Sequence, residues 1–131
     1  MSGAACKVVV DWYGALAAEA AGLSSFASAL GHNTLAAEAT ALATASEAIC
    51  DAGSEMIRYL EDEEPAGYKE AVGQLVALSA EACNWATEVR GYTNSLGKHT
   101  DQNEITGWIN EMRKWRDRGT KLVRDLAAGQ M

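Results

Sequence analysis

The sequence predicts an all-α fold, an up-down-up-down four-helix bundle that forms a single domain over residues 1–131. Two observations lead to this prediction. Alanine occupies 25 of the 131 positions and proline only one, which favours helices because alanine is the strongest helix former and proline the strongest helix breaker. Apolar residues also recur at intervals of three and four in four long stretches that short connections separate. The alternative architecture is a helix-swapped dimer of helical hairpins.

The first predicted helix spans residues 7–30 and ends at Gly31, because glycine readily adopts the left-handed conformation that follows many helices. Glu19 interrupts the apolar spacing, and Ala20 takes its place. The predicted core positions are Val9, Trp12, Leu16, Ala20, Leu23, Phe26 and Leu30.

The second predicted helix spans residues 34–62. Its large apolar residues fall seven positions apart, with alanines between them, and a seam of this kind lets a neighbouring helix approach closely. These large residues are Leu35, Leu42, Ile49 and Met56. The helix leads into the acidic segment 61–64, and Pro65 stands at the start of the next helix, where proline is tolerated.

The third predicted helix, residues 66–96, has an uninterrupted run of apolar positions before Gly97 ends it. The run consists of Tyr68, Ala71, Leu75, Leu78, Ala82, Trp85, Val89, Tyr92 and Leu96. Because Trp85 lies within this run, we expect its ring to be buried.

The fourth predicted helix, residues 101–128, carries the heaviest apolar side chains and most of the positive charge. Asp101 and Glu104 have the spacing of a capping box at its start. Its apolar run is Ile105, Trp108, Met112, Trp115, Gly119, Leu122 and Leu126. We expect Trp115 to be buried and the other helices to pack around this one.

Short connections place segments 31–33 and 97–100 at one end of the bundle, so His32 and His99 should share that end. In a ring of antiparallel neighbours, the fourth helix lies beside the first and third and diagonal to the second. Cys50 and Cys83 would then flank the seam between the second and third helices as small apolar residues.

The formal net charge of −7 makes the surface as a whole repel nucleic acid and anionic membranes. No apolar run is long enough to span a bilayer. Three cysteines, widely spaced and odd in number, argue against a disulfide framework. We therefore expect a cytoplasmic protein of bacterial or phage origin, without a cofactor or a bound metal.

Five cations of the fourth helix are candidate partner-binding residues: Arg113, Lys114, Arg116, Arg118 and Lys121. Cations on an exposed helix face bind phosphate backbones or acidic proteins. Alternatively, they pair with carboxylates of the same chain, which the second helix carries in excess. If the fourth helix lies diagonal to the second, only its last turns reach those carboxylates. Its middle would then remain available to nucleic acid or to an acidic protein.

The second helix contributes three further candidate partner-binding residues, Glu47, Asp51 and Glu55, spaced four apart on one helical face. Carboxylates on bundle helices can hold divalent metals, and dimetal bundles combine them with a Glu-x-x-His motif. The sequence contains no such motif. We interpret these carboxylates as a solvated acidic face that a protein partner can contact.

Eight glycines fall inside the predicted helices, where each costs about 1 kcal/mol relative to alanine. They are Gly14, Gly22, Gly53, Gly67, Gly73, Gly91, Gly107 and Gly119. Two explanations compete: close approach of helices within the monomer, and docking against a partner that completes the fold.

In size, helicity and the basic face of its fourth helix, the chain resembles the small all-helical subunits of CRISPR effector complexes. It also resembles histidine phosphotransfer domains in size and topology, with His32 as the matching residue. We predict a non-enzymatic interaction module, a small subunit or adaptor in a larger protein or nucleoprotein assembly. The alternatives are a phage-type acidic inhibitor of a basic target, and a phosphotransfer or metal-dependent helical enzyme. The expected partner is a protein, with nucleic acid and a second copy of the chain as alternatives and no membrane.

Overall fold

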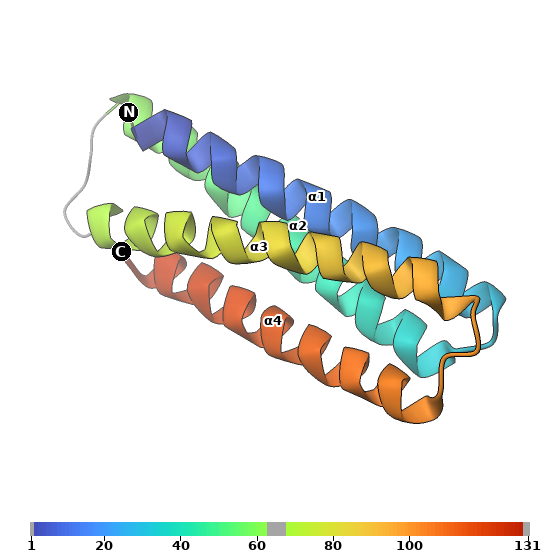
Figure 1. The fold of residues 1–131 in the computed structure, drawn as a ribbon. Helices are drawn as coiled ribbons and strands as arrows, with labels where there is room; N and C mark the ends of the chain where they lie inside the picture. The colour runs from blue at the N-terminus through green and yellow to red at the C-terminus, as the bar shows by residue number, and fades with distance from the viewer. Residues whose placement is uncertain (1, 63–67, 130–131) are drawn as a thin grey trace.

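The computed structural model describes the backbone of residues 2–62 and 68–129, and the side chains of residues 7–54, 73 and 76–124. The described chain is all α-helix, as predicted (Figure 1). Its helices are α1 (Ser2–Ala29), α2 (Asn33–Asp62), α3 (Tyr68–Leu96) and α4 (Gln102–Gly129). These bounds lie close to the predicted ones, except that α1 begins earlier. Pro65 lies outside the described residues.

The helices alternate in direction, so the α1–α2 and α3–α4 connections lie at the same end of the bundle (Figure 1). Both α1 and α4 pack against α2 and α3. The diagonal pairs over the described residues are therefore α1 with α4 and α2 with α3. The prediction that α4 lies beside α1 and diagonal to α2 is wrong. Heptad spacing and short connections set the direction of each helix, but they leave its place in the ring undetermined.

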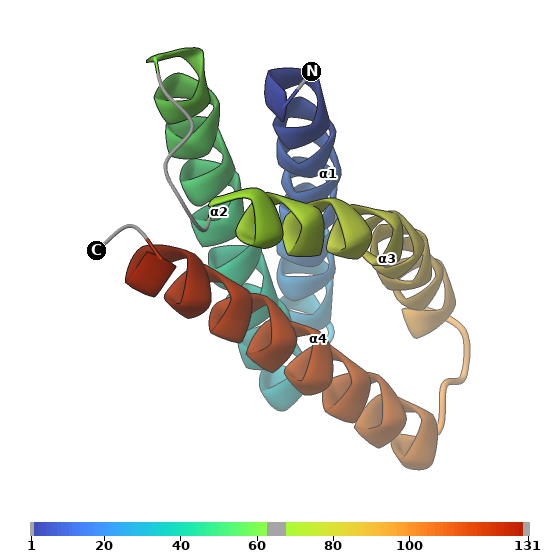
Figure 2. The ribbon, with the colours of Figure 1, turned by 90° about the vertical axis from the view of Figure 1, so that its left-hand side faces the viewer.

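Side-chain size sets how closely the helices approach one another. Both α1 and α2 bury alanines such as Ala20 and Ala39, and these two helices have the most extensive contact. Bulky aromatic rings separate α3 from α4, whose backbones have the least contact of the four neighbouring pairs. Figure 2 shows the α3–α4 hairpin lying across the α1–α2 hairpin.

The core residues of α2, α3 and α4 largely agree with the predicted runs. Leu35, Leu42 and Ile49 are buried on α2, and the predicted burial of Trp85 and Trp115 is confirmed. Some predicted core side chains lie outside those that the structure describes, namely Met56, Tyr68, Ala71, Leu75 and Leu126.

The predicted core face of α1 is partly wrong. Trp12, Phe26 and Leu30 are exposed. The buried residues form two series with seven-residue spacing, which are Val9, Leu16 and Leu23, and Tyr13, Ala20 and Ala27. Glu19 belongs to the same line as Trp12 and Phe26, at intervals of seven. The carboxylate of Glu19 indicates that the whole line, including Trp12 and Phe26, faces away from the core. The core instead takes the neighbouring series, in which Ala20 and Ala27 are much smaller than these aromatic residues.

Two of the predicted signals at the helix ends are confirmed. Gly31 has a φ of 84°, and the His32 N–H donates to the Ala27 carbonyl at 2.9 Å, as expected for a Schellman motif after α1. At the start of α4, the side chain of Asp101 accepts the Glu104 N–H at 2.8 Å. This bond satisfies one of the backbone donors that a helix start leaves unpaired.

Candidate interaction site

The middle of α4 has carboxylate partners because α4 lies beside α2. Arg113 Nε donates to Glu38 Oε1 at 2.9 Å, and Arg116 Nη1 donates to Glu38 Oε2 at 3.1 Å. The Glu38 side chain is only 15% exposed. Its charge is therefore largely shielded from solvent and is balanced by the two arginines. The prediction that α2 pairs well only with the last turns of α4 is wrong, since it depended on the wrong order of helices around the ring.

A third arginine of α4 pairs with α3. Arg118 Nη1 lies 3.0 Å from Glu81 Oε1. The other carboxylate oxygen, Glu81 Oε2, and the hydroxyl of Tyr13 on α1 are buried without a hydrogen-bond partner among the described residues. Burial, and then the nearby charge of Glu81, raise the pKa of Tyr13, so its hydroxyl stays protonated. The three arginines that were predicted to bind partners therefore join α4 to α2 and α3.

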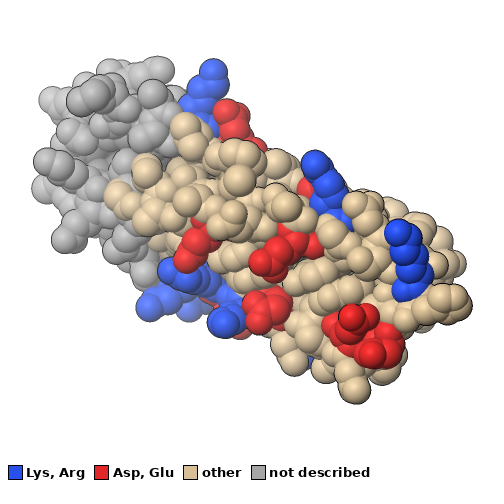
Figure 3. Space-filling view, viewed as in Figure 1, with Lys and Arg blue, Asp and Glu red and all other residues tan. Residues whose placement is uncertain are grey.

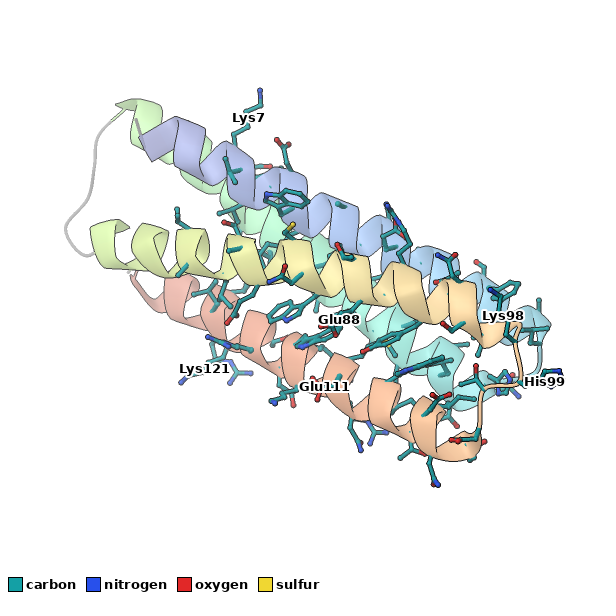
Figure 4. All side chains as sticks on the ribbon, viewed as in Figure 1. Lys7, Glu88, Lys98, His99, Glu111 and Lys121 are labelled. Atoms are coloured by element: carbon teal, nitrogen blue, oxygen red, sulfur yellow. The ribbon has the colours of Figure 1, made fainter. Side chains whose placement is uncertain are left out.

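The two remaining predicted cations, Lys114 and Lys121, are exposed on α4. Figure 4 shows Lys121 pointing away from the bundle. On the face that Figure 3 shows, positive and negative side chains lie next to one another. With Arg113, Arg116 and Arg118 already paired, α4 does not present these three arginines as a stripe of free cations.

The outer face of α2 presents negative charge instead. Glu47 and Asp51 are exposed, and neither forms an ion pair with another residue that the structure describes. The side chain of Glu55 lies outside the described set. Within the described part of the chain, His, Cys, Asp and Glu side chains do not gather in groups of three that could hold a metal ion.

Four stacked aromatic rings fill the seam between α3 and α4. The ring centroids of Trp85 and Trp115 lie 5.3 Å apart, and those of Tyr92 and Trp108 lie 4.6 Å apart. Tyr92 also stacks on Trp115 at 6.5 Å, which joins the two pairs into one column. The column fixes the antiparallel register of α3 and α4.

In this register, a carboxylate of α3 and a carboxylate of α4 occupy facing positions. The residues are Glu88 and Glu111 (Figure 4), one heptad away from the Glu81–Arg118 ion pair. The Tyr92 hydroxyl donates to Glu88 Oε2 at 3.3 Å. Burial raises the pKa of Tyr92, and the charges of Glu88 and Glu111 raise it further. The sequence analysis did not find this acidic pair, because only the register of the two helices brings it together.

The sequence analysis also missed a hollow on the surface of α1. It has a volume of about 250 Å³ and is lined by Val8, Asp11, Trp12 and Ala15. Trp12 is 39% exposed, as is Phe26 further along the helix. The signal in the sequence was Glu19, which marks the line of Trp12 as a surface line.

The described histidines and cysteines do not converge on one site. His32 and His99 lie at the same end of the bundle, as predicted. The Cys50 thiol donates to the Val10 carbonyl of α1 at 3.3 Å, and burial raises its pKa. The prediction that Cys50 and Cys83 flank one seam between α2 and α3 is wrong, because those two helices are diagonal to each other.

Comparison with known proteins finds neither a family model, nor a curated protein, nor a solved structure that matches this chain. None of the described helices combines the length and the apolar character needed to cross a membrane. The distribution of charge and of exposed apolar surface is therefore the basis for inferring function.

Proposed function

We propose that this protein is a non-enzymatic interaction module, a small helical subunit or adaptor that binds a basic protein partner through its acidic surface. One observation supports this above all others: Arg113, Arg116 and Arg118 of α4 are paired within the bundle, whereas several exposed carboxylates have no ion-pair partner among the described residues. These carboxylates are Glu47, Asp51, Glu88 and Glu111.

Exposed cations such as Lys114 and Lys121 remain on α4, but the chain as a whole carries more negative than positive charge. A net charge of −7 steers basic molecules toward the surface and repels polyanions. Exposed carboxylates at the rim of an interface mainly speed association and select partners of opposite charge. This proposal gives the predicted adaptor the basic protein target that the prediction of an acidic inhibitor names.

The placement of the carboxylates favours binding over catalysis. General acid–base or metal chemistry requires side chains that converge on one position. The exposed carboxylates are instead distributed over α2, α3 and α4. Glu47 and Asp51 lie one turn apart on an open helical face, where they can contact cations of an approaching surface.

The proposal is tested with a labelled amphipathic helical peptide of lysine and leucine, a counterpart with glutamate for lysine, and labelled DNA and RNA oligonucleotides. Fluorescence anisotropy should detect binding of the lysine peptide, with affinity that falls as salt rises. The glutamate peptide and the oligonucleotides should not bind. Reversing the acidic face with Glu47→Lys and Asp51→Lys should weaken binding of the lysine peptide. Oligonucleotide binding tighter than peptide binding, or a lysine peptide that does not bind, would overturn the proposal.

A further inference from the structure

The edge between α1 and α3 carries exposed apolar side chains. An ion pair between Glu19 of α1 and Arg90 of α3 joins the two helices at this edge. Since α1 and α3 run in the same direction (Figure 1), residues whole heptads before this pair stay on the same edge. Trp12 lies one heptad before Glu19 and Val76 lies two heptads before Arg90, so the two are offset along this edge by one heptad. The exposed side chains of Trp12 and Val76 therefore belong to the same edge of the bundle.

Large apolar side chains are exposed at this edge. Val8, Trp12 and Val76 are three of the five large hydrophobic residues that are exposed within the described chain. Val8 and Trp12 are one helical turn apart and, with Ala15 and Asp11, are the described residues that line the 250 Å³ hollow. The hollow thus combines an indole, aliphatic walls and one carboxylate.

The carboxylate of the hollow is available to a ligand. Asp11 is exposed and forms no ion pair with any residue in the described part of the chain. Lys7, one turn earlier, points away from the bundle in Figure 4. The hollow therefore presents negative charge next to an aromatic surface, the combination that a cation with an apolar stem requires.

We propose that this hollow binds a lysine or arginine side chain of the basic protein partner, an inference that rests on the function proposed above. The aliphatic stem would lie along Val8, Trp12 and Ala15, and the cationic head would pair with Asp11. Lysine and arginine bury their stems on apolar surface while the charge stays near water or a carboxylate. Tryptophan is the aromatic residue that attracts cations most strongly. It is also among the residues that most often dominate binding at protein interfaces.

A second copy of the chain fits this hollow less well than a basic partner does. Two copies that each carry a net charge of −7 repel one another. Asp11 adds a further negative charge at the contact. A basic partner removes both difficulties, because its cation neutralises the carboxylate.

The experiment measures the affinity of the same labelled lysine–leucine peptide for variants of the full chain. Trp12→Ala should weaken binding about 30-fold, as expected for an interface anchor, and Asp11→Asn should weaken it about 5-fold. Two matched controls should change the affinity by less than about 2-fold. Phe26→Ala removes the other 39% exposed aromatic residue of α1, and Glu104→Gln removes an exposed carboxylate at the start of α4. The indole N–H signal of Trp12 should also shift during the titration.

The outcomes separate the hollow from the proposed function. Tight binding of the lysine peptide that Trp12→Ala and Asp11→Asn leave unchanged would refute the hollow and leave the proposed function intact. Absence of binding to the wild-type chain would refute both. Equal losses for Trp12→Ala and Phe26→Ala would refute a specific anchor at Trp12. A Trp12 signal that shifts with protein concentration alone would show that a second copy occupies the hollow. Circular dichroism of each variant confirms that it is folded.

Discussion

Gly119 on α4 approaches Ile49 on α2 so closely that a Cβ atom on the glycine would lie 2.6 Å from Ile49 Cδ1. Both residues are buried. The glycine therefore allows α4 to lie directly against α2, the neighbour that the sequence analysis did not assign to it. That approach brings Arg113 and Arg116 within reach of Glu38.

Replacement of this glycine by alanine should destabilise the bundle. Alanine adds about 1 kcal/mol of helix propensity, but displacing a packed isoleucine costs about 1–3 kcal/mol. We expect Gly119→Ala to lower the free energy of unfolding by about 1 kcal/mol, measured by urea denaturation. Ile49→Val removes the colliding methyl group. The two substitutions should therefore cost less together than the sum of their separate effects, and additive losses would contradict a direct contact.

Exposed glycines should behave in the opposite way. A Cβ atom at Gly22, Gly91 or Gly107 would meet nothing within 4 Å. Alanine at each site should raise the free energy of unfolding by about 0.5–1 kcal/mol, since glycine weakens a helix interior. Thermal melting of the three single variants tests this expectation. A lower melting temperature would show that the site requires glycine. Close approach of helices inside the monomer would then extend beyond Gly119.

The sequence predicted those parts of the fold that neighbouring residues determine. Gly31 ends α1 and Asp101 caps α4 because both depend on bonds to residues within about one helical turn. The apolar run of α4 identified its buried face because charged residues occupy the positions between. The burial of Trp115 follows from this run alone.

The parts that the sequence did not predict depend on contacts between helices. The position of α4 beside α2 cannot be derived from heptads, since either ring order buries the same residues. This position decides that Glu38 pairs with Arg113. Trp12 is predicted in the core because it fits the apolar spacing of the first helix, although Glu19 on the same helical line indicates solvent. A surface hollow beside Trp12 could not be predicted from the sequence as long as Trp12 was expected to lie in the core.

The aromatic column between α3 and α4 should contribute much of the stability. Trp115 is buried and stacks on Trp85 and Tyr92. Trp115→Ala should lower the free energy of unfolding by about 3–5 kcal/mol, which is enough to unfold a marginal bundle. Trp12→Ala serves as the control, because the exposed ring should contribute less than about 1 kcal/mol. Similar melting temperatures for Trp115→Ala and Trp12→Ala would contradict the larger contribution expected from the buried ring.

Alkaline pH should destabilise the protein through its half-buried and buried tyrosines. The pKa values of Tyr13 and Tyr92 are raised above the ordinary value of 10.0, chiefly by burial. Above pH 10 the unfolded chain loses these protons and the folded chain keeps them. The stabilisation is therefore present below pH 10 and is lost as pH rises further.

The melting temperature should accordingly decline above pH 10, and the decline should be shallower in a variant with Tyr13→Phe and Tyr92→Phe. Lysine deprotonation affects both proteins equally, so the difference between their slopes isolates the two phenols. Parallel slopes would mean that both tyrosines ionise as readily in the folded as in the unfolded chain.

The Glu38 ion pairs should contribute modestly, because their arginines are partly exposed. The side chains of Arg113 and Arg116 are 49% and 30% exposed, and pairs near solvent are weakened by water and salt. Glu38→Gln should therefore lower the free energy of unfolding by about 1 kcal/mol. The loss should shrink as salt rises, in urea denaturation at two salt concentrations.

Simultaneous charge reversal of the three paired arginines should have a larger effect on stability than on binding. Arg113→Glu, Arg116→Glu and Arg118→Glu would place new carboxylates beside Glu38 and Glu81, where like charges repel. Because the proposed partner is basic, binding of the lysine peptide per folded molecule should persist. Restoring attraction with Glu38→Arg and Glu81→Arg should recover stability. Lost peptide binding at unchanged stability would instead assign these arginines to a partner, and α4 would then be the interaction surface.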